Sequence, residues 1–161
     1  MIAKRRSTHR PRVYLSYAAA DEAKARRLET ILSHSDAHVF TIDGLSAGQD
    51  WRSIIKREIA ACDLLVVLLS SNALKSNFVL LQIGAAWALR KTTIAVMADP
   101  SMASELPVRM DPLNVIDLSD PEMPTTLLRM VERYGKAGAA TKARSSHRRL
   151  KGKVVQPKEH V

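Results

Sequence analysis

The chain is short of cysteine and aromatic residues and has no long apolar run. Cys62 is the sole cysteine among 161 residues, which excludes an intramolecular disulfide and a cysteine-rich metal site. The aliphatic run from Leu64 to Leu69 is far shorter than the roughly 20 residues that a membrane-spanning helix needs. The histidines have no metal-ligand spacing. We therefore expect a cytoplasmic protein with one globular unit, no bound metal and no membrane span.

Positive charge is concentrated at the two ends of the chain. Residues 1–12 carry five Lys/Arg and no acid, residues 136–161 carry eight Lys/Arg and one acid, and the part between them has a net charge of −3 out of +9 overall. The last segment has too few large apolar residues to offset the entropy of ordering it. The sequence thus predicts a basic extension over 1–11, one globular domain over 12–135 and a disordered basic tail over 136–161.

The basic tail suggests an anionic partner. Lysine and arginine contacts to phosphates would let residues 136–161 bind nucleic acid or an anionic surface, with a strong dependence on salt. A solvated tail that only keeps the protein soluble fits equally well. The tail has no interleaved aromatic residues, which would suggest stacking on bases.

The body of the chain alternates between strand and helix signals. Because strands joined through helices form right-handed βαβ units, this order predicts an α/β fold with a five-stranded parallel sheet and helices on both faces. A ligand crevice is then expected at the carboxyl ends of the strands. We expect strands at 13–16, 38–42, 64–69, 93–97 and 114–118, and helices at 21–34, 51–62, 76–90 and from 121 onward.

Local signals fix several boundaries within this pattern. Asp21 and Asp50 stand where a carboxylate caps the first turn of a helix. The Gly, Asp and Ser content of residues 43–50 predicts a surface loop. Leu64 to Leu69 is aliphatic throughout, which is typical of a parallel strand buried on both faces. It is expected at the centre of the sheet.

Five motifs in order resemble a TIR (Toll/interleukin-1 receptor homology) domain of the bacterial type. Ser16 and Tyr17 end the first strand with Asp21 close behind, and Ser70 ends the third. The remaining motifs are residues 43–50 followed by Trp51, and residues 76–79 and 83–86 on one helix. The resemblance covers about residues 12–97 well and 98–135 loosely. It implies a flavodoxin-like TIR fold, self-association through the loop 43–50 and, in many bacterial members, cleavage of the nicotinamide–ribose bond of NAD.

Gln82 stands where the family carries its catalytic glutamate, four residues after Phe78. Cleavage of an N-glycosidic bond to a cationic pyridinium develops positive charge on the ribose, which a nearby carboxylate stabilises. An amide of the same shape still hydrogen-bonds but carries no charge, and loss of one such partner costs on the order of 10² to 10³ in rate. The resemblance therefore implies NAD binding with glycohydrolase activity lost or impaired.

Three other interpretations of this position stay open. Asp21, Glu22, Asp43 or Asp50 is a candidate substitute carboxylate from the loops at the same end of the sheet. A second interpretation is a glutamine introduced into an active enzyme to trap a ligand. The third takes Gln82 as a polar residue that is merely tolerated on a helix.

The predicted binding residues lie at strand ends, in the loop and at helix starts. Trp51 and Phe78 also have a structural interpretation, because an aromatic residue at the start of a helix more often anchors the core than stacks on a base. Tyr17, at the end of a strand, fits a ligand contact and a structural capping role equally well. NAD is expected as substrate or ligand rather than as a resident cofactor, and its contacts are expected from Ser16, Tyr17, Asp43, Trp51, Ser70 and Phe78.

Two functions of different classes compete. One is a TIR-domain signalling or defence protein directed at NAD. The other is a non-catalytic TIR adaptor that acts only through contacts with other TIR domains. Gln82 favours the adaptor, whereas the small-residue helix at 83–86 and the Ser16–Tyr17 pair keep the first function open.

Overall fold

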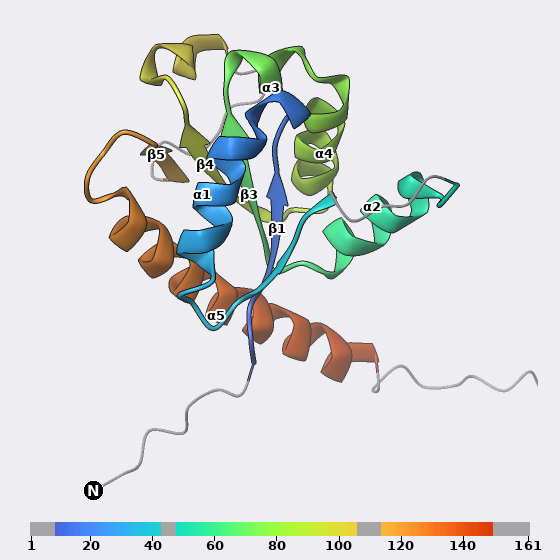
Figure 1. Ribbon diagram of the computed structural model, residues 1–161. Helices are drawn as coiled ribbons and strands as arrows, with labels where there is room; N and C mark the ends of the chain where they lie inside the picture. The colour runs from blue at the N-terminus through green and yellow to red at the C-terminus, as the bar shows by residue number, and fades with distance from the viewer. Residues whose placement is uncertain (1–8, 43–47, 106–113, 150–161) are drawn as a thin grey trace, which may run out of the picture.

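The computed structural model of the chain describes residues 9–42, 48–105 and 114–149. Its centre is a five-stranded sheet in the order β2-β1-β3-β4-β5, and every pairing is parallel (Figure 1). This confirms the predicted sheet, and the order is that of flavodoxin-like folds. The strands are β1 (Arg12–Ser16), β2 (His38–Phe40), β3 (Leu64–Leu69), β4 (Thr92–Met97) and β5 (Val115–Asp117).

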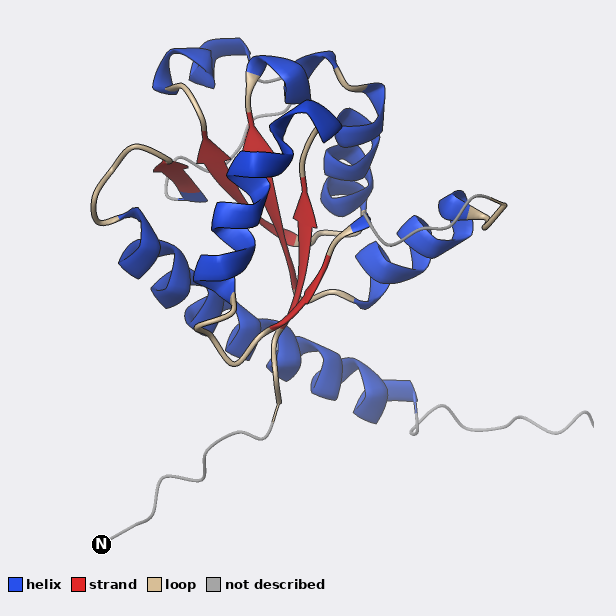
Figure 2. Ribbon diagram, in the orientation of Figure 1, coloured by secondary structure: helices blue, strands red, loops and turns tan. Residues whose placement is uncertain are grey.

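Helices cover both faces of the sheet, as the sequence predicts (Figure 2). On one face lie α1 (Glu22–Leu32), which follows the short 3-10 turn η1 (Ala19–Asp21), and α5 (Met123–Arg149). On the other face lie α2 (Trp51–Ala61), α3 (Ser71–Lys75) and α4 (Asn77–Ala88). A second 3-10 segment, η3 (Pro100–Glu105), follows β4. In the described part of the chain, no helix combines the length and apolar character that crossing a membrane takes.

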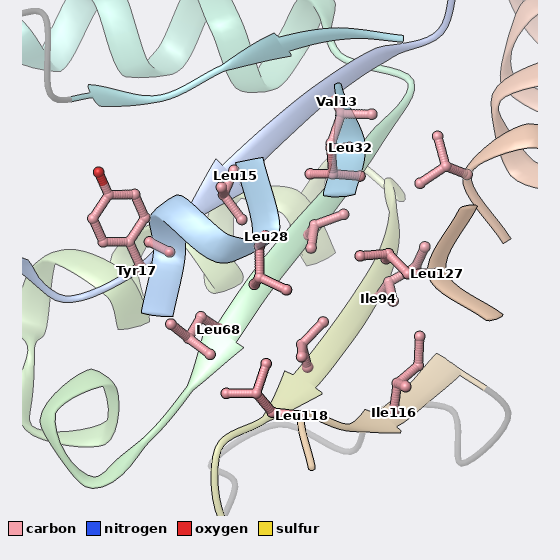
Figure 3. Packing of buried hydrophobic residues seen from close by; sticks show 14 of the residues in the cluster. Val13, Leu15, Tyr17, Leu28, Leu32, Leu68, Ile94, Ile116, Leu118 and Leu127 are labelled. Carbon is pink, nitrogen blue, oxygen red and sulfur yellow. The ribbon is translucent and has the colours of Figure 1, made fainter. Parts of the chain in front are cut away.

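Alternation along the first strand divides the core into two layers. Val13, Leu15 and Tyr17 pack into the layer between the sheet and the helices α1 and α5, which Figure 3 shows in close-up. Tyr14 belongs to the opposite layer, with α2 and α4. Successive side chains of a strand point to opposite faces, so neighbouring residues at the end of β1 enter different layers. Every residue of β3 is fully buried, which confirms its expected place at the centre.

The last helix differs from the sequence prediction at its end. The sequence predicts a disordered tail from residue 136, but α5 continues to Arg149. Alanine, lysine and arginine are good helix formers, and they dominate residues 136–149, so a helix that is already nucleated can extend through them. Residues 150–161 lie outside the described residues.

Gly135 lies inside α5 rather than at its end. The glycine is buried, and a Cβ atom built on it would overlap the side chain of Pro11. The missing side chain therefore lets the segment before β1 cross the helix at close range, which Figure 1 shows below the sheet.

Candidate functional site

The carboxyl ends of β1 and β3 lie side by side at the point where the strand order reverses. These strands pair in parallel from Val13 with Leu64 to Ser16 with Val67, and their chains then leave for helices on opposite faces. Ligands of open α/β sheets bind at this switch point. Two of the predicted site residues, Ser16 and Ser70, end or follow these two strands.

Ser16 and Gln82 are in direct contact at this end of the sheet. Ser16 is the last residue of β1 and is 2% exposed, and Gln82 lies on the inner face of α4 and is 1% exposed. The Ser16 hydroxyl donates a hydrogen bond to Oε1 of Gln82, with 2.5 Å between the oxygen atoms. Nε2 of Gln82 has no hydrogen-bond partner among the described residues.

An unpaired amide nitrogen at this depth is costly. A buried donor without a partner costs about 1–3 kcal/mol, and native proteins rarely leave one in that state. Gln82 therefore lies on the buried side of α4 and not on its exposed surface. Its Oε1 atom accepts from Ser16, and its Nε2 atom has no such partner among the described residues.

A second polar cluster lies at the start of α1. Asp21 is 2% exposed, and its Oδ2 atom accepts a hydrogen bond from the Ser70 hydroxyl. Its Oδ1 atom accepts from Asn72 Nδ2 at 3.1 Å and from Lys24 Nζ at 3.3 Å. Ser70 also caps α3, because its Oγ atom accepts from the backbone N–H of Ala73 at 3.0 Å. This cluster ties the loop after β1 to the loop after β3.

The charge of Asp21 is stabilised by these donors. Burial alone raises the pKa of a carboxyl group, but hydrogen bonds from Ser70, Asn72 and Lys24, together with the Lys24 charge, outweigh it and hold the pKa of Asp21 below its ordinary value. The sequence predicts Asp21 as a helix cap, but its side chain makes no capping hydrogen bond to α1. Its partners come from the third strand's loop instead.

The structure separates two neighbours that the sequence places in one site. Ser16 points to the α4 side, where it meets Gln82, whereas the Tyr17 ring packs in the α1 and α5 layer (Figure 3). The Tyr17 hydroxyl is buried and has no hydrogen-bond partner among the described residues. Ser70 joins Asp21 rather than Gln82. Among the described residues of the predicted set, Ser16 therefore lies with Gln82 on the α4 side, whereas Tyr17 lies on the α1 side and Ser70 bonds Asp21 at the start of α1.

Trp51 and Phe78 form an aromatic pair at the starts of α2 and α4. Their ring centroids are 5.5 Å apart with an interplanar angle of 57°, and the Arg52 guanidinium lies 5.0 Å from the Trp51 ring centroid. Trp51 is 38% exposed, so it is not a fully buried core anchor. Phe78 precedes Gln82 by one helical turn on α4. The aromatic pair and the Gln82 amide are therefore positioned by the same helix.

The loop 43–50 leads into this aromatic pair. Asp50 caps α2 as predicted, because its Oδ1 atom accepts from the Ser53 N–H at 3.3 Å and its Oδ2 from the Ser53 hydroxyl at 2.5 Å. These hydrogen bonds hold the pKa of Asp50 below its ordinary value. Gly48 has a φ of +92°, which favours glycine. Asp43 lies outside the described residues.

Three of the four candidate substitute carboxylates already have hydrogen-bond or ion-pair partners within the chain. Both oxygens of Asp21 accept hydrogen bonds, and so do both oxygens of Asp50. Glu22 pairs with Arg26 at 2.8 Å on the exposed side of α1. Over the described ranges, no three residues among His, Cys, Asp and Glu are grouped so that they could hold a metal ion.

Sequence reasoning missed Asn72 and the structural role of Asp21. Asn72 lies in α3, a short helix that the sequence analysis did not predict. Its signal was Ser70, which precedes two polar residues directly after an aliphatic strand and has the side chain of a good helix cap. No local pattern shows that Asp21 turns toward that cap, since 49 positions separate Asp21 from Ser70.

Comparisons with known proteins agree with this architecture. A search of curated protein sequences finds no match. The TIR domain of the Toll-related receptor TRR-2 from Hydra magnipapillata matches with a TM-score of 0.63 and 19% identity, over 74% of this chain and 97% of that one. The TIR domains of the activated Roq1 resistosome, which recognises the pathogen effector XopQ, match with a TM-score of 0.52 and 19% identity, over 80% and 81%. The CMP N-glycosidase BcmB from Clostridium botulinum matches with a TM-score of 0.50 and 19% identity, over 76% and 98%.

The family model of the TIR domain matches residues 13–130. The match runs from the first strand into the last helix and includes both polar clusters at the switch point. Strand order, helix placement and sequence pattern thus lead to one assignment. The chain belongs to the TIR domain family.

Proposed function

We propose that this chain is a TIR-domain signalling or defence protein that self-assembles and binds NAD at the carboxyl ends of β1 and β3, with glycohydrolase activity lost or impaired. The observation that carries this proposal is the buried Gln82 amide, which Ser16 holds by Oε1 while Nε2 has no partner among the described residues. A polar group this well buried at a switch point supports a ligand site. Because this nitrogen donates, the ligand is expected to offer a hydrogen-bond acceptor, such as the oxygen of a ribose hydroxyl.

The charge at this position decides between binding and turnover. A glutamate held by Ser16 would present a negative oxygen to the ribose as positive charge develops on it. Gln82 keeps the shape and the Ser16 hydrogen bond but presents a neutral donor. The expected loss in rate is on the order of 10² to 10³. The similar fold of a CMP N-glycosidase agrees with a site of this class for cleavage of N-glycosidic bonds.

The aromatic pair would bind the planar part of the nucleotide. Trp51 is partly exposed and packs on Phe78, one turn before Gln82. Stacking on an aromatic ring contributes about 1–3 kcal/mol per base. The loop 43–50, with Asp43, leads into Trp51 and would complete this side of the site.

The test compares the chain with Gln82→Glu at equal, high protein concentration. NAD binding is measured by calorimetry, and NAD consumption and products are separated by chromatography. Gln156→Glu is the matched control, because it makes the same chemical change in the basic tail. We expect all three proteins to bind NAD and only Gln82→Glu to consume it, at a rate at least about 10² above the other two.

Two results would contradict this assignment. If the unaltered chain consumes NAD as fast as Gln82→Glu, another carboxylate such as Asp43 performs the chemistry. If neither protein binds NAD, the site is not a nucleotide site.

The second candidate function is a non-catalytic TIR adaptor that acts only through contacts with other TIR domains. The neutral side chain at position 82 favours it, because the site lacks the charge that catalysis requires. It predicts that Gln82→Glu restores neither binding nor turnover, while the chain still assembles with itself or with another TIR domain.

A further inference from the structure

The N-terminal segment crosses the last helix at the amino end of the sheet. A Cβ atom built on Gly135 of α5 would lie 2.4 Å from the Cγ atom of Pro11, so the glycine lets the segment before β1 pass this close. The Oδ2 atom of buried Asp63 fixes the segment, because it accepts from the Arg12 N–H at 2.8 Å and lies 2.9 Å from His9 Nε2. Residues 9–12 are therefore anchored beside α5, below the sheet in Figure 1.

Helix α5 is strongly basic. It contains seven Lys/Arg, and its one acid, Glu132, pairs with Lys136 at 2.5 Å. Arg129, Arg133 and Lys136 are exposed, and their spacings of four and three place them on one side of the helix. No Asp or Glu follows Glu132 until Glu159. The second half of α5 therefore carries only positive formal charge.

The N-terminal segment adds two cations at the crossing. The side chains of Arg10 and Arg12 are 71% and 45% exposed, and they pair with Asp36 at 3.6 Å and with Glu58 at 3.0 Å. Ion pairs this exposed contribute little free energy, so a phosphate can replace either carboxylate. We call residues 9–12 and 129–149 together the basic ends.

The other end of the sheet carries the opposite charge. Asp99 follows β4, Asp117 is the last residue of β5 and Asp120 follows it. Asp99 and Asp120 are exposed, and Asp117 is partly exposed. The field of the protein therefore directs a polyanion to the amino end of the sheet, away from the Ser16–Gln82 site.

We propose that the basic ends bind double-stranded nucleic acid through its phosphates. A duplex carries one negative charge per about 1.7 Å of its axis, and cations alone bind it without regard to sequence. A single strand is commonly held by aromatic rings that stack on its bases, and residues 135–149 contain no aromatic ring of this kind, Phe, Tyr or Trp. The composition of the helix therefore fits a duplex better than a single strand.

The same composition argues against a lipid surface. A helix that lies on a membrane buries an apolar face at the boundary between headgroups and acyl chains. After Tyr134, α5 has no apolar residue larger than alanine. The helix thus offers charge without an apolar face to insert, which suits a polyanion in water.

The length of the helix gives the expected strength of binding. From Gly135 to Arg149, α5 rises about 21 Å at about 1.5 Å per residue, which corresponds to about six base pairs of about 3.4 Å. If the basic ends neutralise about four to six phosphates, log K falls with log salt with a slope of about −3.6 to −5.4. Affinity should then drop by about 10² to 10³ between about 50 and 200 mM salt.

The basic ends lie mostly outside the part of the chain that the TIR family model matches. That match covers residues 13–130, which leaves out residues 9–12 and nearly all of 129–149. The N-terminal segment also lies at the opposite end of β1 from Ser16. Binding there is therefore independent of the NAD site and goes beyond the proposed function.

The test measures binding of the full chain to a labelled DNA duplex of about 20 base pairs by fluorescence anisotropy, between about 50 and 200 mM NaCl. The double variant Arg129→Gln/Arg133→Gln removes two exposed cations from α5, and Arg10→Gln removes one from the N-terminal segment. Lys56→Gln/Lys75→Gln is the matched control, because it removes two exposed cations from helices on the other face of the sheet.

We expect the unaltered chain and the control to bind the duplex with nearly the same salt slope. The slope should become smaller by about 1.8 in the α5 variant and by about 0.9 in Arg10→Gln, and the α5 variant should bind at least about tenfold more weakly at about 50 mM salt. Two duplexes of unrelated sequence should bind equally, because phosphate contacts carry no sequence information. Circular dichroism should show that all four proteins are folded.

Four results would overturn the proposal. If the control weakens binding as much as the α5 variant does, only net charge matters and the basic ends are not a site. If Arg10→Gln leaves the salt slope unchanged, the two ends do not bind together. If a single strand of the same length binds as tightly, the partner is not a duplex. If vesicles rich in phosphatidylserine bind the chain and the duplex does not, the partner is an anionic membrane.

Discussion

Two glycines in helices should respond in opposite ways to the same substitution. Gly135 lies buried in α5, where an added Cβ atom would overlap the Cβ and Cγ atoms of Pro11. Gly84 lies in α4, where an added Cβ atom would meet nothing within 4 Å. Alanine is favoured over glycine in a helix interior by about 0.5–1 kcal/mol. The gain is the same at both sites, so the surroundings decide the net effect.

The structure sets the expected size of each effect. At Gly84 the full gain of about 0.5–1 kcal/mol should appear as added stability. At Gly135 the overlap with Pro11 forces the N-terminal segment away from α5, and overpacking of this kind costs about 1–3 kcal/mol. Gly135→Ala should therefore be less stable than the unaltered chain by up to about 2.5 kcal/mol, which is the overpacking cost less the helix gain of about 0.5–1 kcal/mol.

The assay is urea denaturation followed by circular dichroism, at a protein concentration where sedimentation shows a monomer. A chain of this size shifts its melting temperature by roughly 2–4 °C per kcal/mol, so thermal unfolding gives a second measure. Pro11→Ala combined with Gly135→Ala is the control, because a smaller side chain at position 11 should relieve part of the overlap. If Gly135→Ala is as stabilising as Gly84→Ala, the close crossing of Pro11 over α5 is wrong.

Two further predictions concern buried carboxylates. The pKa of Asp21 lies below its ordinary value of 3.8, so its contribution to stability is present above pH 3.8 and is lost as the pH falls through the folded-state pKa. Asp21→Asn should therefore reduce the free energy of unfolding by about 1–3 kcal/mol near pH 7, and by less below pH 3.8. Urea titrations across this pH range measure the difference. A difference that does not change with pH would contradict the role of the Asp21 charge. Asp63 accepts hydrogen bonds from the Arg12 N–H at 2.8 Å and from His9 Nε2 at 2.9 Å. Asp63→Ala should lower the free energy of unfolding by about 1–3 kcal/mol, because it leaves the Arg12 N–H without this partner. His9→Ala, at a partly exposed position, should lower it by less than about 1 kcal/mol. Equal losses of stability in thermal unfolding would contradict this ranking.

Local sequence patterns predicted most of the secondary structure. The aliphatic run Leu64–Leu69 is β3 with the same bounds, and Asp50 caps α2. Both signals lie within one element, where burial and capping depend on neighbours along the chain. The α3 helix and the continuation of α5 past Gly135 were missed, because short polar turns and alanine-rich basic segments have no hydrophobic period to detect.

The sequence alone determined the order of strands and helices and the buried centre of the sheet. These follow from side-chain periods of two and of about 3.6 residues, which are properties of the local chain. Only the tertiary structure decided that Ser16 meets Gln82 across 66 positions, and that Tyr17 enters the other core layer. It also decided that Asp21 binds Ser70 rather than capping its helix. Such contacts depend on the pleat of β1 and on how separate elements pack, and no local pattern of residues records which polar groups then meet.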